Sequence, residues 1–296
     1  MGGQSTRHYL NSLSALFGRA IREGILPLGG NPVAAVDKPR VDAAETIWLE
    51  VPEISCILRY AASFRPFRPD LASPHFFPLL ATFAYTGARE TEALGLERHD
   101  VNLDRGIIAL KPNVWRTLKT KNSKRPLHIF PEFAPILRAH LESLKDVPGR
   151  LLFPRRDTDG QEQMIVDIRK MLGRMPMPAR IQVRRSKQQL ETLERERLKK
   201  LRRKITPGLT GPRPSETVEE LSTPTAEWHT PPLRTKIVRH SWCAARLQTL
   251  DWGRPIAIYT VAQEMGHTDT SMVERIYGHL GNFRCRSESV EWMRDD

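Results

Sequence analysis

The chain has 296 residues, of which 40% are hydrophobic and 27% charged, a composition that fits one large or two modest globular domains and excludes a disordered or fibrous chain. The formal net charge of +12 at pH 7 favours a polyanionic partner, first of all nucleic acid, through an attraction that does not depend on base sequence. The three scattered cysteines argue against a disulfide framework, and with no apolar signal core and no apolar run near the roughly 20 residues that span a bilayer, we expect a cytoplasmic protein without a membrane partner.

The first predicted element is a helix over residues 5–23, where apolar residues recur at helical spacing and Gly24 ends the run. Glycine and proline then break regular structure, and we interpret residues 36–47 as a linker. One or two helices bury little apolar surface. Residues 1–35 are therefore expected to be a partial helical segment and not a self-sufficient domain.

The main domain is expected to run from residue 48 to residue 296 and to begin with helices. They are predicted over the amphipathic run 51–62, the apolar run 79–85 and, after a break at Thr86 and Gly87, residues 89–96.

A β region follows these helices. Residues 106–110 are predicted to form a strand, and residues 114–120 and 125–130 a hairpin around the turn 121–124, because both runs alternate in polarity. Helices are then expected at 131–144 and 164–175.

An insertion is predicted at about 183–232. Its first part, residues 184–204, is rich in Lys and Arg and is open to three interpretations: a solvated basic helix, a contact to the DNA backbone, or a helix that binds a partner. Its second part is rich in Pro, Ser and Thr and is expected to be a flexible loop. Helical spacing resumes over 235–250 and 255–266, and a last short helix delivers Tyr277.

Several polar residues stand out on this apolar scaffold, and each also has an ordinary structural explanation. Arg89 fits an ion pair with Glu92, and Tyr277 fits a packed core residue. Lys121 fits a turn lysine, and Arg239 an arginine whose stem packs on apolar surface. Singly, none of them identifies a site.

Together and in order, four stretches resemble the tyrosine recombinases, the phage-integrase family of site-specific recombinases. The stretches are TGARETEALGL (86–96), TKNSKRPLHIFPE (120–132), VRHSWCAARL (238–247) and EMGHTDTSMVERIYGHL (264–280). The resemblance covers about residues 48–285 apart from the insertion. It implies a mainly α fold with a small antiparallel β-sheet (α+β) near Ile107–Ile129.

The resemblance also implies a site, residue by residue. Arg89 and Arg239 match the two arginines, His267 the histidine-or-tryptophan position, and Tyr277 the nucleophile. Lys121 matches the hairpin lysine, with Lys124 as its neighbour, and His240 follows the second arginine as in many members. Lys236 stands where the family usually has histidine, although some members carry lysine there.

This set of residues suits the cleavage of a phosphodiester. Guanidinium groups bind the non-bridging oxygens in pairs and keep their charge at every physiological pH. A lysine can protonate the leaving 5′-oxygen while a tyrosine oxygen attacks phosphorus. The resemblance therefore implies a recombinase acting on double-stranded DNA through a 3′-phosphotyrosyl intermediate, as a homo-tetramer on paired sites, with no metal, ATP, other cofactor or small-molecule substrate.

Two departures from the family pattern keep other functions open. Lys236 puts a proton-accepting role at its position in doubt, and residues 1–35 are expected to hold only the last one or two helices of the family's helical core-binding domain. One alternative is an inactive or truncated remnant that only binds DNA. The other is a strand relaxase of the type IB topoisomerase kind.

Overall fold

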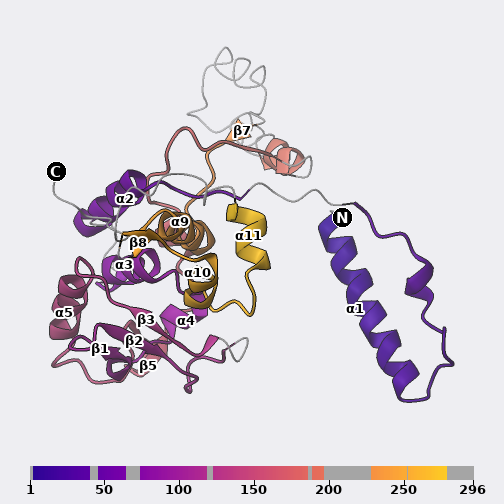
Figure 1. Cartoon of the computed structure of the whole chain (residues 1–296), viewed down its shortest axis with the longest axis horizontal. Coiled ribbons are helices and arrows are strands. Elements are labelled where there is room, and N and C mark those ends of the chain that lie inside the picture. Colours follow the sequence, from indigo (N-terminus) through magenta and orange to yellow (C-terminus); the bar gives the residue numbers. More distant parts are fainter. Residues whose placement is uncertain are drawn as a thin grey trace, which may run out of the picture. The chain divides into compact units, whose positions relative to one another are not determined.

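The computed structural model describes residues 3–40, 46–64, 74–118, 123–185, 189–196, 228–251 and 253–278. The chain divides into two compact units, Met1–Thr46 and Ile47–Asp296 (Figure 1). Within the described residues, no helix combines the length and the apolarity needed to cross a membrane.

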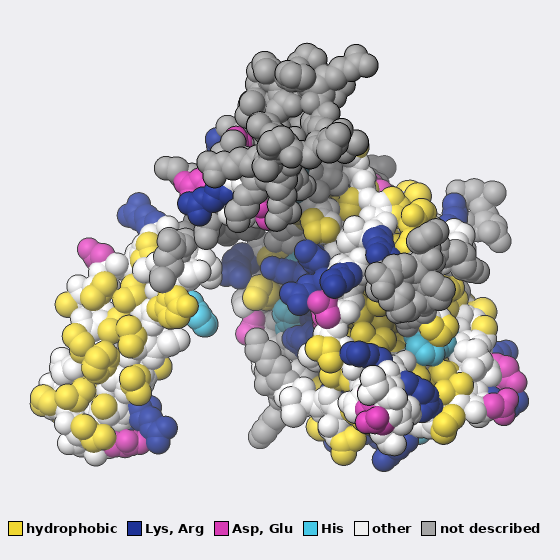
Figure 2. Space-filling model, turned by 180° about the vertical axis from the view of Figure 1, so that it is seen from behind, with side chains coloured by type: hydrophobic (Ala, Val, Ile, Leu, Met, Phe, Trp, Pro, Cys, Tyr) yellow, Lys and Arg dark blue, Asp and Glu magenta, His cyan; other side chains and the backbone are white. Residues whose placement is uncertain are grey.

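The first unit is one long helix with a short segment folded along it. Helix α1 (Gly3–Arg22) is followed by Gly24 in the left-handed region and by the 3₁₀ turn η1 (Pro32–Ala35). Asn31 caps η1 and donates to Ser14 Oγ at 3.0 Å. No residue of α1 is buried, and hydrophobic side chains lie exposed along it (Figure 2). This unit holds little apolar core of its own.

The core of the second unit is built around helix α3 (Phe76–Thr86). All of its residues except Phe77 are buried, because it packs against both α2 (Val51–Ser63) and α9 (Thr235–Leu247). Burial of each large apolar side chain contributes about 1.5–3 kcal/mol. The short helix α4 (Glu90–Leu94) continues from α3 after a turn.

Two short helices and a small sheet flank this helical core (Figure 1). Helix α10 (Ile258–Glu264) packs against α9 and against α11 (Ser271–Tyr277). The antiparallel sheet has the order β1-β2-β3, with β1 at Val101–Asn102, β2 at Ile107–Leu110 and β3 at Arg125–His128. Helix α5 (Ala134–Ser143) packs on α3, and β3 touches α10. The predicted class, mainly α with a small antiparallel sheet, is confirmed.

The predicted strand at 114–120 is wrong over its described part. Strand β3 pairs with β2 instead, with Ile108 opposite Leu127. Asn113 Oδ1 accepts from the main-chain N–H of Arg116 at 2.9 Å, which forms a turn. The Arg116 guanidinium is buried and donates to Gly95 O at 2.8 Å and to Asp100 at 2.9 Å. These bonds fix residues 111–118 in an irregular path.

The predicted helix at 164–175 is also wrong, because only a single turn, α6 (Arg169–Leu172), forms there. Strand β5 (Glu162–Met164) pairs with β4 (Pro154–Arg156) and occupies the start of that run. Asp167 then accepts from the Arg169 N–H at 2.8 Å, so the helix begins late.

Two short antiparallel strand pairs lie at the ends of the predicted insertion and between α9 and α10. Strands β6 (Val183–Arg184) and β7 (Trp228–His229) pair and bring the two ends of the predicted insertion together. Residues 189–196 between them are helical. The rest of the basic stretch and the Pro-rich part lie outside the described residues. Strands β8 (Leu250–Asp251) and β9 (Arg254–Pro255) join α9 to α10.

Candidate active site

The turn after α3 places Arg89. Gly87 ends the helix with φ 59°, and a Cβ atom there would lie 2.6 Å from the Trp242 ring, so this position requires glycine. Arg89 follows in an extended conformation as the N-cap of α4. Glu92 accepts from the Arg89 main-chain N–H at 2.9 Å and from Arg89 Nη1 at 2.8 Å.

The Arg89 guanidinium lies against two further segments of the chain. It donates from Nη1 to Ser123 Oγ at 3.3 Å and from Nη2 to Gly266 O at 3.2 Å. Its side chain remains 27% exposed. It is therefore fixed in orientation and still open to solvent.

Arg239 reaches the same place from α9. Its guanidinium donates to the main-chain oxygens of Gly87 and Met265 and, at 3.2 Å, to His267 Nε2. Burial and then the charges of Arg89 and Arg125 lower the pKa of Arg239 to about 9. Arg239 still carries its proton at pH 7.

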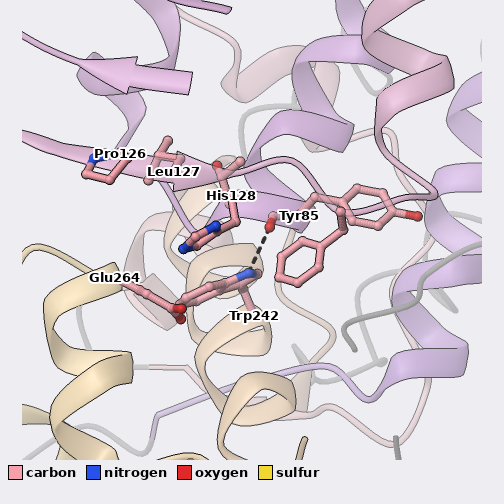
Figure 3. Close-up of a pocket in the computed structure, with 8 residues that line it drawn as sticks. Tyr85, Pro126, Leu127, His128, Trp242 and Glu264 are labelled. Atoms are coloured by element: carbon pink, nitrogen blue, oxygen red, sulfur yellow. Dashed lines mark hydrogen bonds between the residues drawn. The ribbon is translucent and has the colours of Figure 1, made fainter. Parts of the chain in front are cut away.

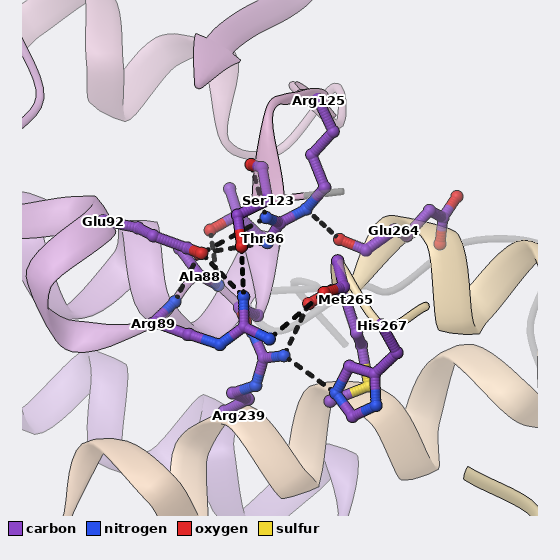
Figure 4. Close-up of polar contacts among 12 residues, drawn as sticks. Thr86, Ala88, Arg89, Glu92, Ser123, Arg125, Arg239, Glu264, Met265 and His267 are labelled. Atoms are coloured by element: carbon purple, nitrogen blue, oxygen red, sulfur yellow. Dashed lines mark hydrogen bonds and ion pairs between the residues drawn. The ribbon is translucent and has the colours of Figure 1, made fainter. Parts of the chain in front are cut away.

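His267 follows the left-handed Gly266 at the end of α10. Burial and then the nearby arginines lower the pKa of His267 to about 4, so the imidazole is neutral at pH 7. Since Nε2 accepts from Arg239, the ring proton is assigned to Nδ1. The structure thus brings together Arg89, Arg239 and His267 from three distant segments (Figure 4).

A third arginine, Arg125, joins this cluster, and the motifs did not single it out. It is 9% exposed and binds both oxygens of Glu92, at 3.3 and 3.1 Å. A signal was present in the sequence, because Arg125 occupies the same inward face of β3 as Leu127. Burial raises the pKa of Glu92, but Arg125 and Arg89 together lower it to about 2.

The charges in this cluster do not balance. Within the described residues, Glu92 is the only carboxylate hydrogen-bonded to the three arginines; it binds Arg89 and Arg125, while Arg239 binds none and His267 is neutral. Lys and Arg side chains also gather on one face of the second unit, with few acidic groups among them (Figure 2). An excess of fixed donors and positive charge is the chemistry of an anion site.

Tyr277 ends α11 and is 2% exposed. Its hydroxyl is hydrogen-bonded to His240 Nδ1, and its ring meets the Trp48 ring edge-on with centroids 6.3 Å apart. Burial raises the pKa of Tyr277 above its ordinary value, and burial with the charge of Lys236 lowers that of His240 to about 4. No hydrogen bond joins Tyr277 to Arg89, Arg239 or His267 in the described part of the chain.

Of the two predicted lysines, the structure describes only Lys236. Lys236 is exposed on the first turn of α9, four residues before His240. Lys121 lies outside the described residues, and its neighbour Lys124 is exposed at the turn before β3. Among the residues that the structure describes, no three His, Cys, Asp or Glu side chains are grouped to hold a metal ion.

A small pocket lies beside the cluster, between β3 and α9 (Figure 3). Its lining includes Leu127, His128 and Trp242, whose Nε1 donates to Tyr85 O at 2.9 Å. Its cavity volume of about 10 Å³ is far below the roughly 300–1,000 Å³ of sites for small organic ligands. The polar cluster, not this pocket, is the candidate site.

No protein-family model and no curated protein matches the sequence. Among solved structures, the Tn1549 transposon integrase in complex with a circular intermediate DNA aligns with a TM-score of 0.56 and 15% identity, over 94% of this chain and 75% of that chain. The same integrase with transposon right end DNA gives 0.53 and 16%, over 90% and 72%. XerA recombinase gives 0.46 and 16%, over 83% and 63%, so this chain spans less than two thirds of XerA. The likeness to the Tn1549 integrase shows that the chain has the tyrosine recombinase fold expected from its sequence.

Proposed function

We propose that this protein is a site-specific DNA recombinase that cleaves and rejoins DNA strands through a 3′-phosphotyrosine at Tyr277, without metal or ATP. The observation that carries the proposal is the convergence of Arg89, Arg239 and His267 around the main-chain oxygens of Gly87, Met265 and Gly266. Main-chain dipoles orient these arginines, and the single carboxylate of Glu92 leaves most of their charge for a substrate phosphate.

The arginines act on the charge that develops on the non-bridging oxygens. Preorganised donors need no rearrangement when that charge appears, and loss of one such donor typically costs about 3–4 kcal/mol of transition-state stabilisation. His267 adds a neutral donor through its Nδ1–H. This division of roles needs no other cation.

The proton of Tyr277 has an acceptor in place. The hydroxyl is hydrogen-bonded to His240 Nδ1, and we assign the ring proton of His240 to Nε2, so that Nδ1 is the acceptor. The usual family base position holds the exposed Lys236. In the proposed step the Tyr277 oxygen bonds to phosphorus, its proton passes to His240, and the bond to the 5′-oxygen breaks as that oxygen takes a proton from Lys121. Rejoining is the reverse of this step.

The proposed substrate is double-stranded DNA. The net charge of +12 and the exposed basic side chains support it, as do the DNA complexes of the Tn1549 integrase that share the fold. We further propose a homo-tetramer on paired sites in the cytoplasm, associated with the nucleoid, in line with the family resemblance.

One observation favours a second candidate, a DNA-binding protein without cleavage activity. Tyr277 is almost fully buried, and its pKa is raised, so its hydroxyl is a poor nucleophile in this state. The two candidates differ in whether DNA binding releases Tyr277.

A nicked suicide duplex separates these candidates. Its sequence is drawn from DNA flanking the gene, and wild type is run beside Tyr277→Phe on a denaturing gel. Recombinase activity gives a covalent adduct with wild type alone. Tight binding without any adduct supports the DNA-binding candidate instead.

A further inference from the structure

Arg125 is the least exposed of the three arginines at the candidate site. It makes four hydrogen bonds: two to Glu92, one to Ser123 O at 3.1 Å and one from Nε to Glu264 O at 2.6 Å. Glu92 belongs to α4 and Glu264 to α10, whose following turn carries His267. Arg125 therefore joins the elements that hold Arg89 and His267 (Figure 4).

Close packing against Gly266 adds to this role. A Cβ atom at Gly266 would lie 2.6 Å from Arg125 Nη1 and 3.3 Å from Arg89 Nη1. Both guanidinium groups thus rest directly on the main chain of the turn before His267. A shift of Arg125 would move that turn and Arg89 together.

Glu92 is shared between two arginines. Its Oε1 accepts from Arg89 Nη1 at 2.8 Å and from Arg125 Nη1 at 3.3 Å, while its Oε2 accepts from Arg125 Nη2 at 3.1 Å. Without Arg125, the full charge of this carboxylate would fall on Arg89. A carboxylate paired with Arg89 alone competes directly with a phosphate for the same fork of donors.

We propose that Arg125 is a positioning residue that neutralises Glu92 and so keeps Arg89 available to a substrate phosphate. This inference rests on the proposed function, because it takes Arg89 as a phosphate ligand. Arg125 itself is enclosed by protein donors and acceptors and acts through Glu92, not by contact with DNA.

The first test uses inorganic phosphate and does not depend on cleavage. Melting temperatures are measured against phosphate, with chloride at matched ionic strength as reference, for wild type, Arg125→Met, Glu92→Gln and the double variant. Phosphate should raise the melting temperature of wild type and raise that of Arg125→Met far less. Glu92→Gln and the double variant should respond alike, because Arg125 matters only while residue 92 is charged.

Two outcomes would overturn the inference. One is a wild type whose melting temperature does not respond to phosphate. The other is an Arg125→Met substitution that weakens the response equally in wild type and in Glu92→Gln, which would mean a direct or purely structural role. If Arg125→Met does not fold, Arg125→Lys replaces it in the same cycle and should give an intermediate loss, since lysine keeps the charge but not the two-pronged contact.

The second test measures cleavage of the suicide duplex at saturating DNA. Arg125→Met should slow adduct formation about 10–100-fold by misplacing Arg89, with a change in duplex Kd below about threefold. Arg246→Met is the matched control, because Arg246 is equally buried but pairs with Glu264 and Asp251. It should lower the melting temperature and leave cleavage by the folded protein within about threefold. If wild type forms no adduct, the recombinase proposal fails while the phosphate test still decides the role of Arg125.

Discussion

Two arginines on helix α9, Arg246 and Arg239, differ in the kind of group that accepts their hydrogen bonds. Arg246 is compensated by carboxylates, since it binds both oxygens of Glu264 and both of Asp251. Arg239, seven residues earlier, is held by main-chain oxygens and by His267. Main-chain oxygens orient a guanidinium without cancelling its charge. The positive charge of Arg239 is therefore not balanced by a bound carboxylate, whereas the charge of Arg246 is balanced by two.

The same reasoning makes Arg89→Lys a direct test of the site. Lysine offers one point of charge and cannot bind Glu92, Gly266 O and a phosphate at once. We expect adduct formation to fall about 10²–10³-fold, with duplex binding nearly unchanged. Single-turnover cleavage of the suicide duplex measures the rate of adduct formation. Arg169→Lys, at an exposed ion pair with Asp167, is the control and should stay within about twofold of wild type; equal losses in both variants would contradict the assignment.

The proton acceptor is tested by comparing His240→Ala with Lys236→Ala. Because the Tyr277 hydroxyl is hydrogen-bonded to His240 and not to Lys236, the first substitution should slow adduct formation about 10²-fold or more and the second far less. Rates are taken at saturating duplex so that binding does not contribute. A larger loss of adduct formation for Lys236→Ala than for His240→Ala would mean that Lys236, at the usual family position, accepts the proton.

At the level of elements, the turn between α3 and α4 depends on Gly87. Alanine there would adopt φ near 59° and meet the Trp242 ring, so Gly87→Ala should lower the free energy of unfolding by about 2–4 kcal/mol. Gly160→Ala is the matched control, because its φ is 74° but nothing lies within 4 Å of the new Cβ. It should cost about 1 kcal/mol. Urea unfolding measures both, and equal values would mean that Trp242 moves aside freely.

The junction of α3 and α5 is expected to be sensitive to acid. His75 and His140 pack edge to face, and burial lowers the pKa of His75 to about 4 and that of His140 below its ordinary value. In the unfolded chain both imidazoles bind a proton near pH 6.5. The free energy of unfolding therefore keeps its full value above that pH and falls as the pH drops toward 4. Urea unfolding between pH 7 and 4 measures the slope. His140→Gln, which can still bond to Leu152 O, should flatten it, and an unchanged slope would assign the acid sensitivity to other groups.

For the whole molecule, charge is expected to govern affinity. The logarithm of the duplex Kd should rise linearly with the logarithm of salt concentration, because DNA binding releases counterions. Replacing residues 186–227 by a two-residue turn should leave the fold intact, since β6 and β7 already pair at the base of the insertion. A lower salt slope in that variant would assign the basic stretch to the DNA backbone. A slope that hardly depends on salt in either protein would contradict phosphate contact altogether.

Elements that depend on local interactions were predicted correctly from the sequence, and elements that depend on contacts between distant residues were not. Helices α1, α2, α3 and α9 were predictable because the apolar spacing that favours a helix lies within about four turns of chain. The strand at 114–120 was not, because the polarity pattern does not reveal that Arg116 is buried by bonds to Gly95 O and Asp100. The helix predicted over residues 164–175 was wrong for a similar reason, because the pairing of β5 with β4 outweighed the helical spacing of the apolar residues.

By itself the sequence determined the fold class, and through its resemblance to the tyrosine recombinases it gave Arg89, Arg239, His267 and Tyr277 as candidate site residues, because motifs and apolar periodicity are local properties. Only the tertiary structure decided that Arg125 shares Glu92 with Arg89 and that Tyr277 is hydrogen-bonded to His240. These contacts join residues far apart in the chain, such as Arg125 and Glu264, 139 positions apart. Such pairs meet only after α3, α9 and the sheet have packed, so no local pattern specifies them.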